Sequence, residues 1–159
     1  MKMREMCLEL ALSPSLCNVI FDVMRGQDSD QKLLQKLLSD RKDLFSSLRR
    51  SIRSVSVLRA MERVPREAFV PTGERPDSYL DLPLAIGEGQ TISQPYIVAL
   101  ITEALRLQPA DRVLEVGAGS GYQAAVLAKL VPDGKVVTVE LVRTLTQRAR
   151  DTLNDLGYK

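Results

Sequence analysis

The sequence predicts an α/β protein with a doubly wound parallel sheet, preceded by an α-helical N-terminal extension. Three observations lead to this fold class. An apolar run at Arg112–Val116 reads as a buried strand, and a second apolar run at 135–140 reads as another. Helical segments follow both strands through short connections, which is typical of parallel sheets with right-handed crossovers. Three glycines stand at alternate positions directly after the first strand.

Composition excludes several classes of protein. The chain has 159 residues, 45% of them apolar, which suits one domain or one domain with a helical extension. A net charge of +2 favours neither a nucleic acid nor a membrane as partner. Cys7 and Cys17, in a chain without histidine, exclude a disulfide framework and the usual metal sites. Charges and Pro14 interrupt the apolar N-terminal patch, so we expect no signal peptide or membrane span, and a cytoplasmic location.

The first elements are helical. Short helices are expected at residues 3–12 and 30–38, and residues 1–42 are interpreted as an extension of unknown role. An amphipathic helix follows, because apolar residues recur at spacings of four and three: Leu44, Leu48, Ile52, Val55 and Leu58. The basic residues on its other face are interpreted as a solvated surface; they are Arg49, Arg50, Arg53 and Arg59.

A long irregular segment is expected next, because prolines and glycines recur between residues 65 and 89. Loops of this length are usually functional or disordered. Pro95 fits the first turn of the next helix, with Ser93 or Gln94 at its cap, and the helix should end before Pro109. Its expected apolar face consists of Ile97, Val98, Ile101, Ala104 and Leu105.

The region after Pro109 is more regular. A strand at Arg112–Val116, a glycine turn at 117–121 and a helix at Tyr122–Leu130 are expected. Pro132, Asp133 and Gly134 predict a reversal. A strand at 135–140 and a helix at 143–156, stopped by Gly157, complete the pattern.

The glycine turn, EVGAGSGY at 115–122, is the sharpest motif. Its glycines allow a tight turn and let a ligand lie against backbone amides that no Cβ obstructs. The third glycine is Gly121, one position short of the dinucleotide fingerprint, and no G-K-[S/T] follows, which disfavours a phosphate cradle. Glu140 ends the second strand, where a carboxylate can accept hydrogen bonds from both hydroxyls of a ribose. Taken alone, the turn could be structural and Glu140 a solvated strand end; together they favour S-adenosylmethionine, whose adenosine has no phosphate.

The chain from about residue 58 to residue 158 closely resembles the protein-L-isoaspartate O-methyltransferases. The runs that match are MERVPREAFVP at 61–71, LPLAIGEGQTISQPYIVA at 82–99, RVLEVGAGSGYQAAVLA at 112–128 and VTVE at 137–140. Many methyltransferases share the glycine turn, whereas GQTISQP is more specific and disfavours another methyltransferase class. The resemblance implies a Rossmann-like S-adenosylmethionine-dependent methyltransferase fold. It also implies methyl transfer to the free carboxyl of L-isoaspartyl residues in damaged proteins, a repair reaction.

The resemblance also implies roles for individual residues. Ser93 would be the active-site serine that orients the acceptor carboxylate, with Thr91 and Ile92 shaping the wall between peptide and cofactor. No general base is needed, because a carboxyl group with a pKa of about 4 is already ionised at neutral pH. The alternative is that Ser93 only caps the helix at Pro95. The residues implied to hold the cofactor are Glu115, Gly117, Ala118, Gly119, Ser120, Gly121 and Glu140. Glu115 could equally be a charge at a strand terminus.

In the family that the chain resembles, further strands follow the second helix, whereas this sequence ends at Lys159. We therefore expect residues 43–159 to be the N-terminal part of the methyltransferase domain, a fold incomplete at the C-terminus with apolar edges and faces uncovered. A partner chain could complete the sheet. The alternative to a repair enzyme is a truncated, non-catalytic methyltransferase-like interaction protein.

Overall fold

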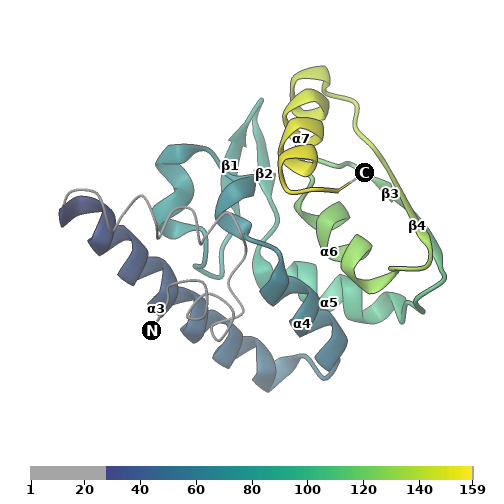
Figure 1. The fold of residues 1–159 in the computed structure, drawn as a ribbon, viewed down its shortest axis with the longest axis horizontal. Helices are drawn as coiled ribbons and strands as arrows, with labels where there is room; N and C mark the ends of the chain where they lie inside the picture. The colour runs from purple at the N-terminus through teal and green to yellow at the C-terminus, as the bar shows by residue number, and fades with distance from the viewer. Residues whose placement is uncertain (1–27, 159) are drawn as a thin grey trace.

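The computed structural model describes residues 28–158, which form a helical part and a sheet part in contact with each other (Figure 1). The expected helix at residues 3–12 lies outside the described residues. In Figure 1, α3 runs along one side of the molecule, while β3 and β4 lie at the opposite side. The elements of the helical part are α3 (Asp28–Ser51), α4 (Val55–Arg63), η1 (Arg66–Phe69) and η2 (Thr72–Asp77). Those that follow are β1 (Leu84–Gly87), β2 (Gln90–Ile92), α5 (Pro95–Leu105), β3 (Arg112–Val116), α6 (Tyr122–Leu130), β4 (Lys135–Val139) and α7 (Arg143–Asp155).

The first described helix, α3, runs without a break through the expected boundary near residue 42. The helix expected at 30–38 and the start of the amphipathic stripe therefore belong to one element, and Leu37, Leu44 and Leu48 are buried along it. Leu37 lies on the N-terminal side of the expected boundary and packs in the same core. The division into an extension and a domain stays a prediction.

The amphipathic stripe does not continue as a single helix, which corrects the expectation for Val55. The helix ends at Ser51, and the backbone amides of Arg53 and Ser54 donate to Oε1 of Glu103. The Ser54 hydroxyl then caps α4 by accepting from the amide of Val57. Because α4 starts in a new direction, Val55 is 59% exposed, whereas Val57 and Leu58 are buried.

The segment expected to be irregular contains two 3₁₀ turns and an antiparallel hairpin. Strands β1 and β2 pair with Leu84 opposite Ile92. Their connection is Glu88 and Gly89, which both have positive φ (54° and 67°), as in the two-residue turns that suit the twist of a hairpin. The strands are only four and three residues long, so their alternation was too short to predict them.

The parallel pairing agrees with the sequence, but the expected burial of the first strand is wrong, because Leu114 and Val116 of β3 are exposed. Strand β3 pairs with β4 in parallel, from Arg112 opposite Lys135 to Val116 opposite Val139. The chain reverses before β4 at Gly134, where an added Cβ would lie 2.0 Å from the carbonyl oxygen of Asp111. Strand β4 ends one residue before Glu140, and α7 ends at Asp155, one residue earlier than expected.

Two apolar patches are exposed within the part of the chain that the structure describes. We call the first the sheet patch, and its members and exposed fractions are Leu114 (65%), Val116 (79%), Val137 (44%), Val139 (46%) and Leu141 (98%). The second, the helix patch, is on α5: Ile97 (37%), Leu100 (42%), Ile101 (53%) and Leu105 (48%). The expected apolar face of α5 is thus corrected, because the face that packs inward is Pro95, Val98, Ala99 and Thr102. No helix within residues 28–158 is long and apolar enough to cross a membrane.

Candidate functional site

The glycine turn follows β3, and its backbone conformation depends on its glycines. Gly117, Gly119 and Gly121 all have positive φ, at 94°, 54° and 87°. The amides of Gly117 and Ala118 both donate to the carbonyl of Val139, at 2.8 and 3.0 Å. The turn is therefore fastened to the end of β4, which brings it beside Glu140.

The three glycines have different surroundings. A Cβ at Gly117 would meet nothing within 4 Å, so a ligand can approach the backbone there. A Cβ at Gly119 would lie 3.4 Å from Cδ1 of Ile86 in the hairpin. A Cβ at Gly121 would lie 3.2 to 3.3 Å from Leu153 and Ala149, so Gly121 permits the close approach of α7. Gly121 is buried and does not offer a surface to a ligand, unlike Gly117.

The remaining two residues of the turn are less open than Gly117. Ala118 is 8% exposed, so its contribution to a ligand site is through its backbone. The Ser120 hydroxyl accepts a hydrogen bond from the amide of Tyr122, at 3.4 Å, across the start of α6.

Glu140 directly follows β4 and lies against the glycine turn. Its Oε2 accepts from the amide of Gly119 at 2.8 Å, and its Oε1 accepts from the amide of Val142 at 2.9 Å. These amides, first that of Val142, lower the pKa of Glu140. The carboxylate is therefore ionised at neutral pH and acts only as an acceptor, with lone pairs left for hydroxyl donors.

Glu115 is held by the sheet. It lies opposite Thr138 in the β3–β4 register and accepts a hydrogen bond from the Thr138 hydroxyl. Burial raises the pKa of Glu115, the Thr138 bond opposes this rise, and the nearby charge of Glu140 adds to it. This arrangement favours a role in orienting the strand end.

The serine loop, residues 91–94, consists of the last two residues of β2 and the two residues before α5. The side chains of Thr91 and Ser93 are exposed, whereas Ile92 is 4% exposed and packs in the core, so it can shape a site only through its packing. Gln94, not Ser93, is the N-cap of α5, and it makes no capping bond with its side chain. Within residues 28–158 the Ser93 hydroxyl has no hydrogen-bond partner, so the helix-cap alternative for Ser93 is wrong and its hydroxyl is available.

The hairpin is bonded to the first half of α7. Arg148 donates from Nη1 to the carbonyl of Ile86 at 3.2 Å, and the Thr144 hydroxyl donates to Oε1 of Glu88 at 2.9 Å. With the contact between Ile86 and Gly119, these bonds bring the hairpin, the glycine turn and the helix after Glu140 together.

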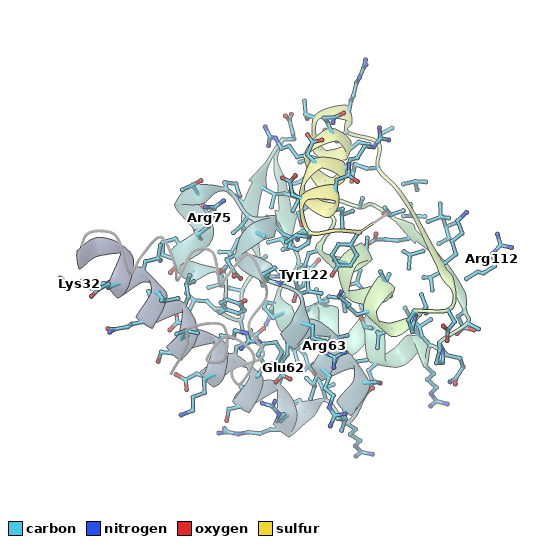
Figure 2. The ribbon with its side chains drawn as sticks, viewed as in Figure 1. Lys32, Glu62, Arg63, Arg75, Arg112 and Tyr122 are labelled. Carbon is cyan, nitrogen blue, oxygen red and sulfur yellow. The ribbon has the colours of Figure 1, made fainter. Side chains whose placement is uncertain are left out.

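Sequence reasoning missed a further residue, Arg66. Its Nη2 donates to the carbonyl of Ser93 at 2.8 Å, and its guanidinium lies over the ring of Tyr122. Figure 2 shows Tyr122 in the interior of the molecule, at the start of α6. The available signal was an arginine between apolar residues in RVPREAFVP.

Hollows lined by described residues lie beside the glycine turn. One, of about 570 Å³, has Ile86, Gly119 and Ser120 on one side and Arg148 of α7 on another. The other, of about 720 Å³, has Ala118, Thr138 and Glu140 in its lining, between α6 and α7. Both volumes are in the range of small-molecule sites.

Known proteins resemble the chain as follows. The family model for protein-L-isoaspartate (D-aspartate) O-methyltransferase (PCMT) matches residues 39–159. A protein-L-isoaspartate O-methyltransferase of Methanothermobacter thermautotrophicus is 50% identical over 125 residues, 77% of this chain and 58% of the relative. One from Roseiflexus sp. (strain RS-1) is 60% identical over 111 residues, 70% of this chain and 50% of the relative. The chain thus spans about half the length of the curated relatives that it matches.

Solved structures agree with the sequence relatives. A structure of a protein-L-isoaspartate O-methyltransferase is similar with a TM-score of 0.67 and 34% identity, covering 75% of this chain and 39% of the other. A Plasmodium falciparum structure assigned to the same class, in complex with S-adenosyl-L-homocysteine, has a TM-score of 0.66 and 28% identity, covering 74% of this chain and 56% of the other. The parallel β3–β4 pair, the glycine turn, Glu140 and the serine loop lie within the matched residues. The chain belongs to the protein-L-isoaspartate (D-aspartate) O-methyltransferase family.

Proposed function

We propose that this chain provides the donor and acceptor loops of a protein-L-isoaspartate O-methyltransferase, which transfers a methyl group from S-adenosylmethionine to the free carboxyl of L-isoaspartyl residues in damaged proteins. One observation is central to the proposal. The Ser93 hydroxyl is exposed and has no hydrogen-bond partner among the described residues, and its loop follows a hairpin that is packed against the glycine turn through Ile86 and Gly119. The family match covers both loops.

The residues present fit the adenosyl cofactor. The open space over Gly117 leaves the backbone of the turn accessible, and the ionised Glu140 can accept hydrogen bonds from ribose hydroxyls. Ala118, Gly119 and Ser120 would contribute the rest of the cradle, with Gly121 and Glu115 supporting it from behind. When bound, the cofactor supplies an electrophilic methyl group on a sulfonium.

The acceptor needs orientation more than activation. An isoaspartyl carboxyl group, with an ordinary pKa of about 4, is ionised at neutral pH, so no base has to remove a proton. The Ser93 hydroxyl can donate a hydrogen bond to one carboxylate oxygen and so direct the other, and Thr91 can bound the site beside it. Holding two reactants in line and excluding water contributes about 7–11 kcal/mol at its best.

A partner chain is the second part of the proposal. The sheet patch exposes five large apolar side chains on and just after two strands, and parallel strands normally have both faces covered. The relatives are about twice as long as the matched segment. The part of a relative outside that segment could cover the exposed face of the strands. We infer that the sheet patch receives the C-terminal half of a family domain, and that this half can associate with the chain as a partner.

The partner is tested by mixing this chain with the part of the Roseiflexus relative that follows the matched segment. We expect a 1:1 complex in analytical ultracentrifugation, abolished by Leu114→Asp but not by Val55→Asp. Val55 is a matched control because it is 59% exposed, close to the 65% of Leu114, but lies on α4. A homodimer of this chain through the sheet patch, or a complex that Leu114→Asp leaves intact, would refute the proposed partner.

The reaction is tested by methyl transfer from labelled S-adenosylmethionine to a peptide with L-isoaspartate, beside the same peptide with normal aspartate. The chain is assayed alone and with the complementary half. We expect label only in the isoaspartyl peptide and a strong loss in Ser93→Ala. Folded protein that labels neither peptide in either condition would contradict the enzymatic proposal and favour a non-catalytic interaction protein. The cytoplasmic location stays a prediction.

A further inference from the structure

Arg66 is a buried cation between the two loops. It is 1% exposed, in η1, and no salt bridge to it forms within residues 28–158. Its Nε donates to the carbonyl of Ser78 and its Nη2 to the carbonyl of Ser93, both at 2.8 Å. Nη1 is buried without a hydrogen-bond partner among the described residues. Burying an unpaired charge opposes folding, so the position calls for a reason beyond packing.

The guanidinium also contacts the start of α6. Its Cζ lies 5.0 Å from the ring centroid of Tyr122, within the distance of a cation–π interaction. Tyr122 directly follows the glycine turn and is 3% exposed. The ring of Phe69, from the same 3₁₀ turn as Arg66, meets the Tyr122 ring edge-on, with centroids 5.5 Å apart.

The guanidinium of Arg66 thus makes two contacts that join the loops. Its Nη2 donates to the backbone of the serine loop, and its Cζ lies over the ring of Tyr122, the first residue after the glycine turn. The Ser93 carbonyl points inward to Arg66, while the Ser93 side chain is exposed on the surface. Only a planar group with several donors can make these contacts at once, and lysine cannot replace it.

We infer that Arg66 is a positioning residue that fixes the Ser93 loop relative to the glycine turn. The inference rests on the proposed function, because it concerns the alignment of acceptor and donor. A misplacement of about 1 Å between reacting groups can lower a rate about 100-fold. Loss of the Arg66 guanidinium is therefore expected to lower kcat far more than it changes the affinity for the cofactor.

The first experiment does not depend on activity. Hydrogen exchange followed by mass spectrometry is measured on the folded wild-type chain and on Arg66→Lys, with Arg41→Lys as the matched control. Arg41 also lies over an aromatic ring, Phe45 at 5.6 Å, and donates to a backbone carbonyl, that of Glu62 at 2.6 Å. We expect Arg66→Lys to speed exchange at least tenfold in residues 88–96 and to leave β3 and β4 unchanged, while Arg41→Lys leaves both segments as in the wild type. Wild-type exchange at 88–96 in Arg66→Lys would overturn the inference.

The second experiment separates positioning from general stability. Methyl transfer to the isoaspartyl peptide is measured, with the complementary half present, for the same variants and for Tyr122→Leu. We expect kcat to fall at least 30-fold in Arg66→Lys, with KM for S-adenosylmethionine within threefold of the wild type, and Tyr122→Leu to change in the same direction. Equal losses in kcat and in cofactor binding would assign Arg66 a purely structural role. A wild-type chain without activity would refute the proposed function alone, since the exchange result still decides whether Arg66 holds the loop.

Discussion

The helical half of the molecule and its sheet half are packed to different degrees. Leu48 of α3 and Met61 of α4 are 2% and 1% exposed, whereas Leu114 and Val116 of β3 are 65% and 79% exposed. Ser93 belongs to the packed half, through the bond of its carbonyl to Arg66, while Glu140 belongs to the sheet half. The difference indicates that contacts within this chain determine the position of the serine loop, whereas the surroundings of the residues proposed to hold the cofactor depend on what covers the strands.

The largest expected effect compares equal substitutions in the two halves. Leu48→Ala should lower the free energy of unfolding by about 3 kcal/mol, because it opens a cavity in the core. Leu114→Ala should change it by less than about 0.5 kcal/mol, because the side chain is already in water. Urea denaturation of both variants measures this, and similar losses would mean that the sheet patch is covered in solution.

The second prediction compares two glycines of one turn. Gly121→Ala should cost about 2 kcal/mol, because its positive φ is strained for alanine and the new methyl meets Leu153 and Ala149. Gly117→Ala should cost only the backbone strain, about 1 kcal/mol, since space around it is open. Thermal unfolding of the two variants tests the order, and a larger loss at Gly117 would contradict the assignment of Gly121 to helix packing.

The third prediction concerns the bond that joins β3 to β4 through their side chains. Thr138→Val keeps the branched shape but removes the donor to Glu115, at a cost of about 1 kcal/mol. Because that bond lowers the pKa of Glu115, the pKa should rise further in the variant. Carboxyl NMR titration checks the shift, and an unchanged pKa would show that the hydroxyl does not reach the carboxylate in solution.

The smallest effect is expected at Glu140. Its pKa is lower in the folded state than the ordinary value of 4.5, so its ionised form stabilises the fold. This stabilisation is present above pH 4.5 and is lost as the pH falls through the folded value, and solvent screening keeps it small. The stability difference between wild type and Glu140→Gln, measured by urea denaturation from pH 3.5 to 7, should therefore shrink toward acid. A difference that grows toward acid would mean that Glu140 is not held by the amides of Gly119 and Val142.

Local features were predictable from the sequence. The strands at Arg112–Val116 and Lys135–Val139, their parallel pairing and the place of Glu140 follow from apolar runs, glycines and a short reversal that lie next to one another in the chain. The run around Ser93 was singled out in a different way, by its resemblance to one family.

What could not be predicted depends on distant partners. The exposure of Val55 follows from a helix break that Glu103 of α5 stabilises, about 50 residues away in the chain. The partners of Arg66 lie at residues 78, 93 and 122, and no local spacing relates them. The hairpin was not predicted, because three residues show too little alternation of apolar and polar side chains to distinguish a strand from a loop.

Gly134 restricts how the chain can vary. Every side chain other than hydrogen would place its Cβ 2.0 Å from a backbone oxygen that pairs with the amide of Lys135, so neither partner can move without loosening the first rung of the sheet. In a complete scan of substitutions, this reversal, for which no role in the reaction is proposed, should tolerate as little change as the glycine turn. Positions that tolerate no substitution in this chain therefore do not all belong to the catalytic site. An invariant Gly134 would reflect the lack of space for a side chain.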